Sequence, residues 1–417
     1  MRGYRTYSIG AGRKMRTATK PAGRRGPFRE RKPQRRRGTV LVYTAELLPY
    51  SETFVRDHVA SLTRGSAILV GSKAVRGLST EGIEIELLPN SRWARIRLWL
   101  FGKSPSLDRL IETRAVVLIH AHFADAGARL AKYARRKGLP LVVTLHGSDV
   151  LRRPGWSMRD VVTRLLWHRL MRSADMFLPV SDHIALKAIV RGVPPSKLHR
   201  HYLGIPLSPP GTRLHATGSP PTIMFVGRLV EKKGLTYLLD ACRILADRGH
   251  PFQLRIIGDG PLLEECRAQA ETLGGRVTFV GRASPDQVRK ELGAAQIVCM
   301  PSIEAQDGDN EGLPIVSLEA QAAELPIVAF DQGPLRECVE ADVSGLLAKD
   351  RSVESLASCL ARLLHDPDLR QRMGAAGRRN VEARFNIKEQ SQQLEDIYEQ
   401  LLASRPSSCA NIAREHA

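Results

Sequence analysis

Residues 297–319 read IVCMPSIEAQDGDNEGLPIVSLE, and this stretch indicates how the chain folds. A short apolar run, Ile297–Met300, is followed by a polar loop and then by a helical pattern in which Pro314 suits the first position. Apolar strands that alternate with helices are typical of a parallel sheet covered on both faces. Ligands of such sheets lie beyond the carboxyl ends of the strands, which makes this loop a candidate binding site.

The start of the helix carries groups suited to an anionic ligand with hydroxyl groups. Free backbone amides at a helix start can bind phosphate oxygens, and here they belong to Gly312, Leu313 and Ile315. Glu311 is expected on the lip of the loop, and Glu319, about one and a half turns into the helix, faces the same cleft. Both carboxylates can accept hydrogen bonds from sugar and ribose hydroxyls.

The alternation of strands and helices runs along most of the chain and is interrupted once, at the Pro-, Gly- and Ser-rich residues 204–221. The predicted fold class is α/β, with two Rossmann-like doubly wound parallel-sheet domains facing across a cleft. The predicted divisions are a basic tail at 1–38, domains at 39–210 and 211–386, a helix at 387–404 that crosses back to the first domain, and a flexible tail at 405–417. Predicted strands are 39–44, 67–71, 83–88, 116–121, 141–145, 176–180, 222–226, 254–257, 277–280, 297–300, 327–330 and 345–348.

The net charge of +20 is concentrated at the amino end. Residues 1–37 hold 14 Lys and Arg with one acid, so this segment accounts for +13 of it. The charge of the remaining residues is modest, so a nucleic-acid-binding protein is the weaker alternative. The sequence has no run of about 18 apolar residues, and no membrane-spanning helix is expected. The six cysteines lack metal-ligand spacing and are expected to be buried free thiols.

Three further junctions in the second domain place small or charged residues where a ligand is expected. In FVGRLVEKKG (225–234), Gly227 lets the chain turn, and Arg228 and Lys233 form a candidate diphosphate clamp, with Lys232 as an alternative for the lysine role. A solvated basic loop is the competing interpretation. The glycines at Gly258 and Gly260 permit close backbone approach to a ligand, although this turn is equally a helix start. A nucleobase fits against the strand end at Gly281 and Arg282.

Taken together, GRLxxKKG, GDGP and EGLP with Glu319 resemble the retaining glycosyltransferases of the GT-B type, the group 1 family, over roughly residues 39–400. PSIEAQDGDNEGLP and SETFV are most similar to the branch that builds bacterial exopolysaccharide, colanic-acid-like and lipopolysaccharide units. The resemblance implies transfer of a hexose-type sugar from a UDP- or GDP-sugar, with retention, to a saccharide acceptor, lipid-linked in the expected case. It implies that Arg228 and Lys233 neutralise the diphosphate, Glu311 contacts the donor sugar and Glu319 the ribose.

The first domain is expected to bring the acceptor. His146, in LHGSD at a strand end, faces the reacting centre in the family, and Asp149 is either part of that site or a helix cap. His122 is expected to line the cleft, while His120 is expected to turn into the sheet. Further acceptor-side candidates, in the first strand-to-helix loop, are Ser51 and Glu52.

Two features qualify this prediction. Asp307-Gly-Asp309 matches a metal motif of another glycosyltransferase fold, but the family implied here balances diphosphate charge with cations and amides, so no metal and no cofactor are expected. RWARIRLWLF (92–101) places Trp93, Ile96, Trp99 and Leu100 on one helix face. It is either an interfacial helix that contacts an anionic membrane or a helix packed on its own sheet. The expected location is cytoplasmic, at the inner face of the plasma membrane if the helix is interfacial. A nucleotide-sugar epimerase on the same fold is the alternative enzyme.

Overall fold

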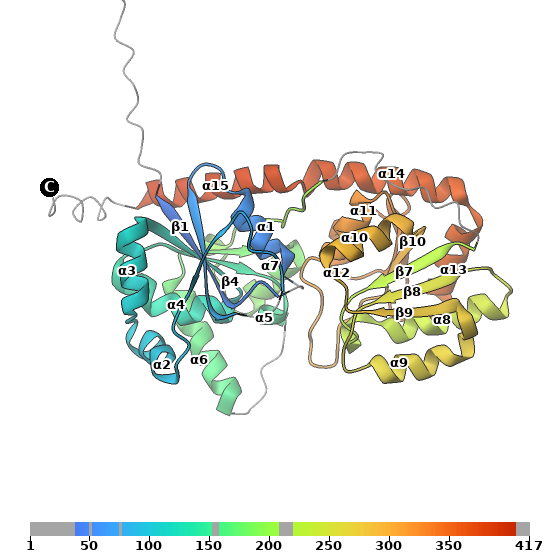
Figure 1. The fold of residues 1–417 in the computed structure, drawn as a ribbon, viewed down its shortest axis with the longest axis horizontal. Coiled ribbons are helices and arrows are strands. Elements are labelled where there is room, and N and C mark those ends of the chain that lie inside the picture. Colours follow the sequence, from blue (N-terminus) through green and yellow to red (C-terminus); the bar gives the residue numbers. More distant parts are fainter. Residues whose placement is uncertain (1–37, 50–51, 75–76, 152–157, 208–219, 406–417) are drawn as a thin grey trace, which may run out of the picture. The chain divides into compact units, whose positions relative to one another are not determined.

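Two six-stranded parallel sheets organise the chain (Figure 1). The computed structural model describes residues 38–49, 52–74, 77–151, 158–207 and 220–405. The first sheet has the order β3-β2-β1-β4-β5-β6 and the second the order β12-β11-β10-β7-β8-β9. Read outward from the strand at which the order reverses, both sheets have the 3-2-1-4-5-6 arrangement of a dinucleotide-binding fold. The predicted α/β fold class with two Rossmann-like sheets is confirmed.

The first half contains β1 (Thr39–Leu47), α1 (Thr53–Ser61), β2 (Ser66–Ala74), β3 (Glu84–Leu87), α2 (Arg92–Phe101), α3 (Pro105–Arg114), β4 (Val116–His122), α4 (Ala124–Lys137), β5 (Leu141–Leu145), α5 (Ser148–Leu151), α6 (Met158–Ser173), β6 (Met176–Pro179) and α7 (Asp182–Val190). Strand β1 shows why the sheet is covered on both faces. Val40 and Val42 pack toward α1, whereas Leu41 and Tyr43 point to the opposite face, toward α4.

The second half contains β7 (Thr222–Val226), α8 (Leu235–Asp247), β8 (Gln253–Ile257), α9 (Leu263–Ala270), β9 (Val277–Gly281), α10 (Pro285–Ala294), β10 (Ile297–Met300), α11 (Ile315–Ala322), β11 (Ile327–Phe330), α12 (Gly333–Cys338), β12 (Gly345–Ala348), α13 (Val353–His365), α14 (Pro367–Arg384) and α15 (Ile387–Ser404). Short 3-10 turns lie at Pro195–Lys197, Glu231–Lys233 and Glu271–Arg276. All twelve predicted strands are present, and five of them have the predicted bounds.

Helices α14 and α15 lie along both halves of the chain (Figure 1). α14 packs against α11, and α15 packs against α1. The contact of α15 is polar as well as apolar, because the Glu395 carboxylate accepts hydrogen bonds from the backbone amides of Thr63 at 2.7 Å and of Arg64. Leu394 and Ile397 are buried in the same core as Val55 of α1. The last helix is therefore part of the first half's core.

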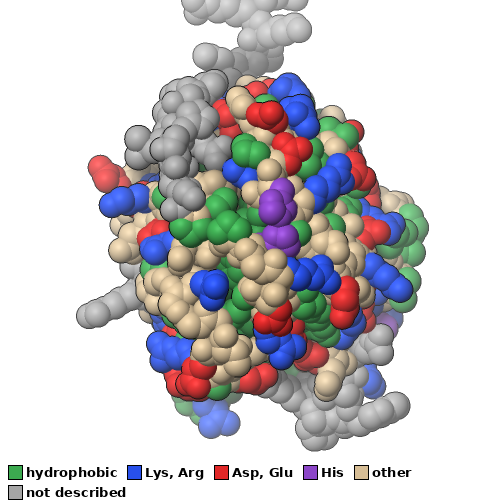
Figure 2. All heavy atoms as spheres, turned by 90° about the vertical axis from the view of Figure 1, so that its right-hand side faces the viewer, with side chains coloured by type: hydrophobic (Ala, Val, Ile, Leu, Met, Phe, Trp, Pro, Cys, Tyr) green, Lys and Arg blue, Asp and Glu red, His purple; other side chains and the backbone are tan. Residues whose placement is uncertain are grey.

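The remaining sequence-based expectations concern the two tails, the linker, the cysteines, membrane-spanning helices and the distribution of charge. All but residue 38 of the predicted tail at 1–38, all but residue 405 of that at 405–417, and most of the 204–221 linker lie outside the described residues. Of the cysteines, Cys242, Cys266, Cys299 and Cys338 are buried free thiols and Cys359 is half-buried, while Cys409 is not among the described residues. In the described ranges, no helix combines the length and apolarity that crossing a bilayer requires. Basic and acidic side chains are interleaved over the face of the molecule seen in Figure 2.

Candidate active site

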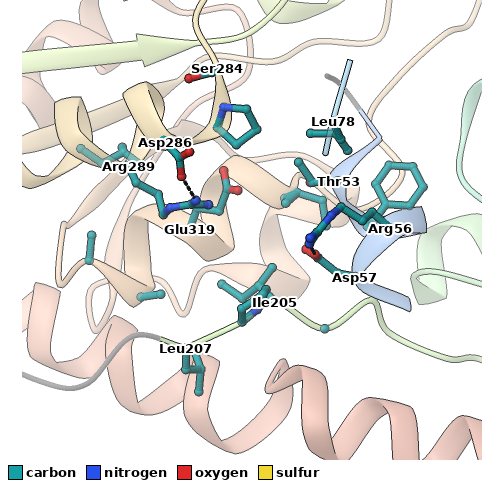
Figure 3. A pocket seen from close by; sticks show the side chains of 18 of the residues that line it. Thr53, Arg56, Asp57, Leu78, Ile205, Leu207, Ser284, Asp286, Arg289 and Glu319 are labelled. Atoms are coloured by element: carbon teal, nitrogen blue, oxygen red, sulfur yellow. Dashed lines mark hydrogen bonds and ion pairs between the residues drawn. The ribbon is translucent and has the colours of Figure 1, made fainter. Parts of the chain in front are cut away.

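A cavity of about 660 Å³ lies between α1 of the first half and α10 and α11 of the second. Figure 3 shows Glu319 and Arg289 on one side of it and Arg56 and Asp57 facing them from α1. Ile315, the first residue of α11, also lines this cavity. The cleft predicted between the two sheets therefore contains Glu319, one of the predicted donor-binding residues.

The start of α11 differs from the prediction in one detail. Pro314 is the residue before the helix, with φ −76° and ψ 95°, so the helix begins at Ile315 and not at Pro314. Its extended ψ keeps Pro314 out of the first turn. As a consequence, Glu319 lies about one turn into the helix, not one and a half. Leu313 and Gly312 precede it in the buried loop, next to the helix amides.

The two halves meet at Gly312. A β-carbon on Gly312 would lie 1.6 Å from the carbonyl oxygen of His146, and one on Gly147 would lie 3.1 Å from the Gly312 amide nitrogen. The backbone of the EGLP loop therefore touches the backbone of the HGSD loop. The carboxyl ends of β10 and β5 converge at this point, which brings the predicted donor and acceptor motifs together.

Glu311 forms a buried ion pair with Lys233, with Oε1 and Nζ 2.7 Å apart. Ser302 donates a hydrogen bond to the same carboxylate at 3.1 Å. Burial alone would raise the pKa of Glu311, but Lys233, Lys232 and the Ser302 hydrogen bond outweigh it and hold the pKa below its usual value. The prediction that Glu311 sits on the lip of the loop is wrong, because Lys233 draws its carboxylate into the interior, where it is 7% exposed.

Lys232 and Arg228 take different positions from Lys233. The Lys232 ammonium pairs with Asp309 at 3.1 Å and also donates to the Asn310 carbonyl oxygen. Asp307, the other carboxylate of the Asp-Gly-Asp motif, accepts a hydrogen bond from the Asp309 amide. Arg228 is exposed and forms no ion pair with any residue in the described ranges. Its guanidinium is thus accessible to a ligand, whereas Lys232 already holds the loop.

The glycines Gly227, Gly258 and Gly260 lie where neighbouring loops approach one another closely. A β-carbon on Gly258, which has φ +144°, would lie 1.8 Å from the Gly227 carbonyl oxygen, and one on Gly260 would lie 2.4 Å from that of Leu229. The close approach predicted for a ligand is instead made by the neighbouring loop. Gly227 leaves room for the Lys233 stem, whose Cδ would be 3.3 Å from a β-carbon there.

Gly281 and Arg282 lie at the end of β9. Gly281 has φ +80° and open space around its α-carbon, and its carbonyl oxygen accepts a hydrogen bond from the Gly258 amide. Arg282 is 83% exposed and pairs with Asp259 at 2.8 Å. Asp259 is thereby committed to Arg282 and to the Gly260 amide, and it does not cap α9.

Glu319 is half-buried in the cavity. Burial raises the pKa of its carboxyl to about 7; nearby Arg289 opposes this shift and nearby Asp57 adds to it. Arg289 is itself ion-paired with Asp286 on the same helix. Glu319 therefore changes charge near neutral pH and lies where it can accept hydrogen bonds from a ligand.

His146 is half-buried among aromatic rings. Its ring centroid lies 4.6 Å from that of Phe54 and 4.4 Å from that of Phe123, and its Nε2 is 2.9 Å from Nδ1 of His122. Burial, with a smaller contribution from His58, lowers the pKa of His146 to about 3, so the ring is neutral at physiological pH.

Of the two predictions for the histidines of β4, the one for His120, expected to turn into the sheet, agrees with its burial, and the one for His122 is wrong. Residues two apart on a strand point to the same face, and the rings of His120 and His122 are stacked with centroids 4.9 Å apart. Both are buried, so His122 does not line the open cleft. It lies behind His146 instead.

Asp149 acts as a cap. Its carboxylate accepts hydrogen bonds from the amide of Ala124, the first residue of α4, at 3.0 Å and from the Gly147 and His146 amides at 2.9 and 3.2 Å. Burial raises the pKa of Asp149 to about 6 despite these bonds. Of the two open interpretations of Asp149, these contacts favour the cap, and the helix that it caps is α4, although Asp149 itself lies in α5.

Glu52 precedes α1, and Ser51 lies outside the described residues. Oε2 of Glu52 is buried with no hydrogen-bond partner in the described ranges. Burial raises the pKa of Glu52 to about 7, helped by Glu46 and Asp125. Glu52 is therefore an acid available for a proton or a hydroxyl group.

Sequence reasoning missed several residues, which lie in helices without motifs except for Ser302, in the loop after β10. Arg289 and Asp57 face Glu319, Ser302 holds Glu311, and His58 and Tyr398 bond to the histidines behind His146. Ring nitrogens of His58, His120 and His122 lie within 4.8 Å of one another, the one such metal-ligand group in the described ranges. No sequence spacing connects these residues, because they come from different elements.

Two Rossmann-like sheets that face across a cleft, with the start of a helix on one side and a histidine on the other, are the architecture of the GT-B glycosyltransferases. Residues 213–380 match the family described as Glycosyl transferases group 1, and residues 58–208 match Glycosyltransferase Family 4. The chain belongs to this glycosyltransferase family.

Several relatives are similar over most of the chain. The amylovoran biosynthesis glycosyltransferase AmsK of Erwinia amylovora is 33% identical over 285 residues, 67% of this chain and 69% of that protein. The putative colanic acid biosynthesis glycosyltransferase WcaL of Escherichia coli is 33% identical, over 66% and 68%. A GDP-mannose-dependent phosphatidylinositol monomannoside mannosyltransferase of Mycobacterium tuberculosis is 32% identical, over 67% and 76%. Among solved structures, Anabaena HepE in complex with UDP and glucose superposes with a TM-score of 0.71 at 20% identity, over 86% and 99%.

Proposed function

We propose that this glycosyltransferase moves a hexose-type sugar from a UDP- or GDP-sugar to a saccharide acceptor in exopolysaccharide or related synthesis. The observation that carries the proposal is the contact of Gly312 with His146, which brings the loop before α11, whose amides are predicted to bind phosphate, next to a histidine of the first half. The names of the relatives support the polysaccharide branch, and that of the mannosyltransferase, with its phosphatidylinositol acceptor, supports a lipid-linked one.

The donor lies along the second half in this proposal. Glu319 accepts hydrogen bonds from the ribose, and the nucleobase lies toward Gly281 and Arg282. The amides at the start of α11, with exposed Arg228 and Lys233, receive the diphosphate. The Lys233 ammonium has three protons, so it can bridge Glu311 and a phosphate oxygen at once. Glu311 then lies next to the diphosphate, where the donor sugar's hydroxyl groups are expected.

The difficult step is departure of the nucleoside diphosphate. The bond between the anomeric carbon and the β-phosphate oxygen breaks, its electrons pass to that oxygen, and Arg228, Lys233 and the helix amides stabilise the growing charge. The acceptor oxygen then bonds to the anomeric carbon, and its proton passes to the departing phosphate oxygen. No metal takes part in this scheme.

Retention of configuration is part of the proposal. The two carboxylates beside the Gly312–His146 contact are both engaged, Glu311 by Lys233 and Asp149 by backbone amides. Neither is available as a nucleophile, which favours attack on the same face over a covalent intermediate. Glu52, with its unpartnered carboxyl oxygen, is the acceptor-side group best suited to hold an incoming hydroxyl.

Donor binding is expected to depend on pH in a defined direction. The ionised form of Glu319 accepts more hydrogen bonds from ribose hydroxyls than the protonated form. Because its pKa is about 7, affinity for the donor should rise as pH increases from 6 to 8 and then level off. We would screen UDP- and GDP-sugars for thermal protection and slow donor hydrolysis at these pH values, in the wild type and in Glu319→Gln.

The wild type should be protected by one nucleotide class, with protection that increases toward pH 8, and Glu319→Gln should remove that increase. Absence of protection and hydrolysis with every nucleotide sugar would contradict the proposed function. A pH dependence that persists in Glu319→Gln would contradict only the ribose assignment.

We further propose that α2 and α6 bring the enzyme to anionic membranes, where a lipid-linked acceptor resides. Leu98 of α2 is buried, and Ile96 and Trp99 are half-buried, so the four-residue apolar face predicted for this helix is not exposed as a unit. Trp93 of α2 is 79% exposed, and Leu165 of α6 is 65% exposed. Arg169 of α6 donates a hydrogen bond to the Trp99 carbonyl oxygen of α2, and α2 packs on α4.

The protein lacking residues 1–37 is expected to pellet with phosphatidylglycerol vesicles at low salt, because exposed Arg92, Arg95 and Arg97 surround Trp93. Replacing Trp93 and Leu165 by Ser should abolish pelleting. Val190 of α7, 84% exposed, provides the matched control, since Val190→Ser removes an exposed apolar side chain elsewhere. Equal pelleting of both variants, or none by the parent, would contradict membrane contact through α2 and α6.

A further inference from the structure

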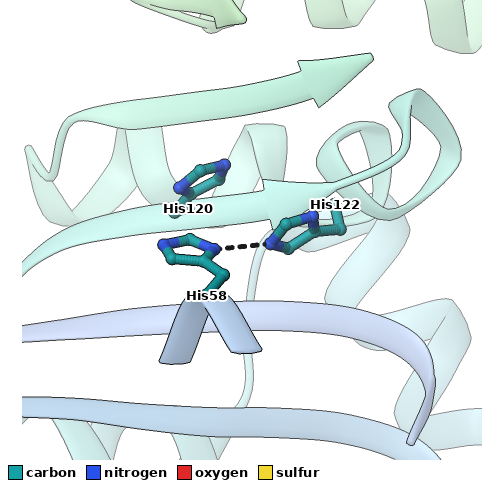
Figure 4. A group of neighbouring side chains, drawn as sticks. All are labelled: His58, His120 and His122. Atoms are coloured by element: carbon teal, nitrogen blue, oxygen red, sulfur yellow. Dashed lines mark hydrogen bonds between the residues drawn. The ribbon is translucent and has the colours of Figure 1, made fainter. Parts of the chain in front are cut away.

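A continuous chain of hydrogen bonds runs through the interior of the first half and ends on His146. It starts in β5, passes through β4, reaches the last helix α15, returns through α1 to β4 and leaves for the loop after β5. Its members, in order, are Thr144, His120, Tyr398, His58, His122 and His146. Figure 4 shows the three histidines at its centre, with His58 pointing at His122.

Each link has hydrogen-bond geometry. Oγ1 of Thr144 lies 2.6 Å from Nε2 of His120, whose Nδ1 bonds to the Tyr398 hydroxyl. That hydroxyl lies 3.1 Å from Nε2 of His58, and Nδ1 of His58 lies 2.8 Å from Nε2 of His122. Both ring nitrogens of all three inner histidines are therefore used.

The inner members are buried and neutral. Thr144, Tyr398 and the three inner histidines are each at most 6% exposed. Burial, with smaller contributions from neighbouring histidines, holds the pKa values of His58, His120 and His122 well below the usual value. No charged side chain in the described ranges hydrogen-bonds to the side chain of any of the six members, so no such bond stabilises an imidazolium.

Because the histidine rings of this chain are neutral, the tautomer of each ring depends on the tautomer of its neighbour. A neutral imidazole has one N–H donor and one acceptor nitrogen, and a tyrosine hydroxyl has a single proton. If Thr144 donates to His120, each following group must donate onward, and His146 accepts at Nε2 and carries its proton on Nδ1. If the direction is reversed, His146 donates from Nε2, and its Nδ1 is a bare acceptor. The chain thus has two arrangements, and each fixes His146.

A shared metal ion is the competing explanation for three histidines in one place. Two nitrogens bound to one zinc ion at about 2.0–2.1 Å in tetrahedral geometry are held more than 3 Å apart, whereas those of His58 and His122 lie 2.8 Å apart, the separation of a hydrogen bond. The Tyr398 hydroxyl also lies between His58 and His120, bonded to both. The geometry thus favours the hydrogen-bonded chain.

We propose that this chain sets the tautomer of His146, so that Tyr398 and Thr144, neither of which reaches the cleft, decide whether Nδ1 of His146 offers a donor or an acceptor to the substrate. Nδ1 makes no hydrogen bond to another described residue, so it is the nitrogen left for a ligand. The kinetic part of the inference rests on the proposed function of His146 at the reacting centre. Tyr398 and Thr144 are positioning residues.

Tyr398→Phe removes one hydroxyl and breaks the chain in its middle. In protein with ¹⁵N-labelled histidine, the wild type should show one protonated and one bare ring nitrogen for His146, assigned with His146→Gln. Tyr398→Phe should average the two signals. Turnover should fall roughly tenfold or more with the donor KM nearly unchanged, since the wrong tautomer impairs the reaction more than binding.

Two further variants control for structural damage. Tyr43 is equally buried and bonds to Ser72 away from the chain, so Tyr43→Phe removes a matched hydroxyl and should leave the His146 signals and turnover unchanged. Thr144→Val should reproduce the effects of Tyr398→Phe from the far end, whereas Thr144→Ser, which keeps the hydroxyl, should restore wild-type signals. The Thr144 pair also tests the inference if Tyr398→Phe does not fold.

Unchanged His146 signals in both Tyr398→Phe and Thr144→Val would overturn the inference. So would an equal loss of turnover in Tyr43→Phe, or one equivalent of tightly bound zinc in the purified protein. Because the nitrogen signals are recorded without substrate, they test the inference even if no sugar donor is found. A protein without transferase activity would therefore contradict the proposed function alone.

Discussion

Lys233→Ala is expected to lower turnover by roughly 10²–10³-fold, the usual loss when one group that stabilises a departing anion is removed. Lys233 is the cation that contacts Glu311, at 2.7 Å, and its stem lies against Gly227. The variant also leaves a buried carboxylate without its partner, which costs about 3–5 kcal/mol of stability. Turnover should be measured with saturating donor, alongside thermal unfolding.

The neighbouring lysine provides the control. Lys232→Ala removes the same charge one residue away, but Lys232 pairs with Asp309 and holds the loop. Its loss should weaken stability and change turnover much less. The pair variant Lys233→Met with Glu311→Gln removes both charges and should recover stability without recovering activity. If Lys232→Ala were the more impaired enzyme, the assignment of the lysine role would be reversed.

Gly312→Ala should lower transfer by at least roughly 100-fold, because a displacement of about 1 Å at a reacting centre has effects of that size. The new β-carbon would lie 1.6 Å from the His146 carbonyl oxygen, and both atoms next to the clash are backbone, which cannot rotate away. The loops after β10 and β5 must then separate. Initial rates of transfer and of donor hydrolysis would measure the loss.

Gly275→Ala is the matched change, since no atom lies within 4 Å of a β-carbon there, and it should stay within about twofold of the wild type. Nucleotide binding in Gly312→Ala distinguishes two causes. If nucleotide still protects Gly312→Ala but the variant no longer transfers sugar, the result would agree with separated loops. A fully active Gly312→Ala would show that the contact between the two loops is unimportant for catalysis.

The fold was predictable because its signals are local. Ile297–Met300 and Leu141–Leu145 are continuous apolar runs bounded by loops, and their observed bounds are those predicted. Pro314 was placed one residue too far into the helix, since φ near −76° suits both positions and only ψ distinguishes them. Local patterns thus predict the elements, although the ends of β1 and β2 differ from the predicted ones by up to three residues.

The site was predictable only in part, because its contacts are distant in sequence. Glu311 was expected at the surface since nothing near it in the sequence announces Lys233 as its partner. Tyr398 bonds to His120 across 278 positions. The separation of His120 from His122, in contrast, contradicted the two-residue period of a strand, and that error was avoidable. The catalytic and binding roles of Lys233, Glu311 and His146 stay predictions.

Helix α15 packs in the first half of the structure, although it follows the second half in the sequence. The first half is built from residues at both ends of the described chain, because Tyr398, Leu394 and Glu395 complete its interior. A single cut between the two sheets therefore cannot release two autonomous fragments, since the amino-terminal piece would lack its last helix. Fragment complementation should succeed only when residues 387–404 accompany that piece, and on the ribosome His58 and His120 acquire their Tyr398 partner only when α15 has emerged.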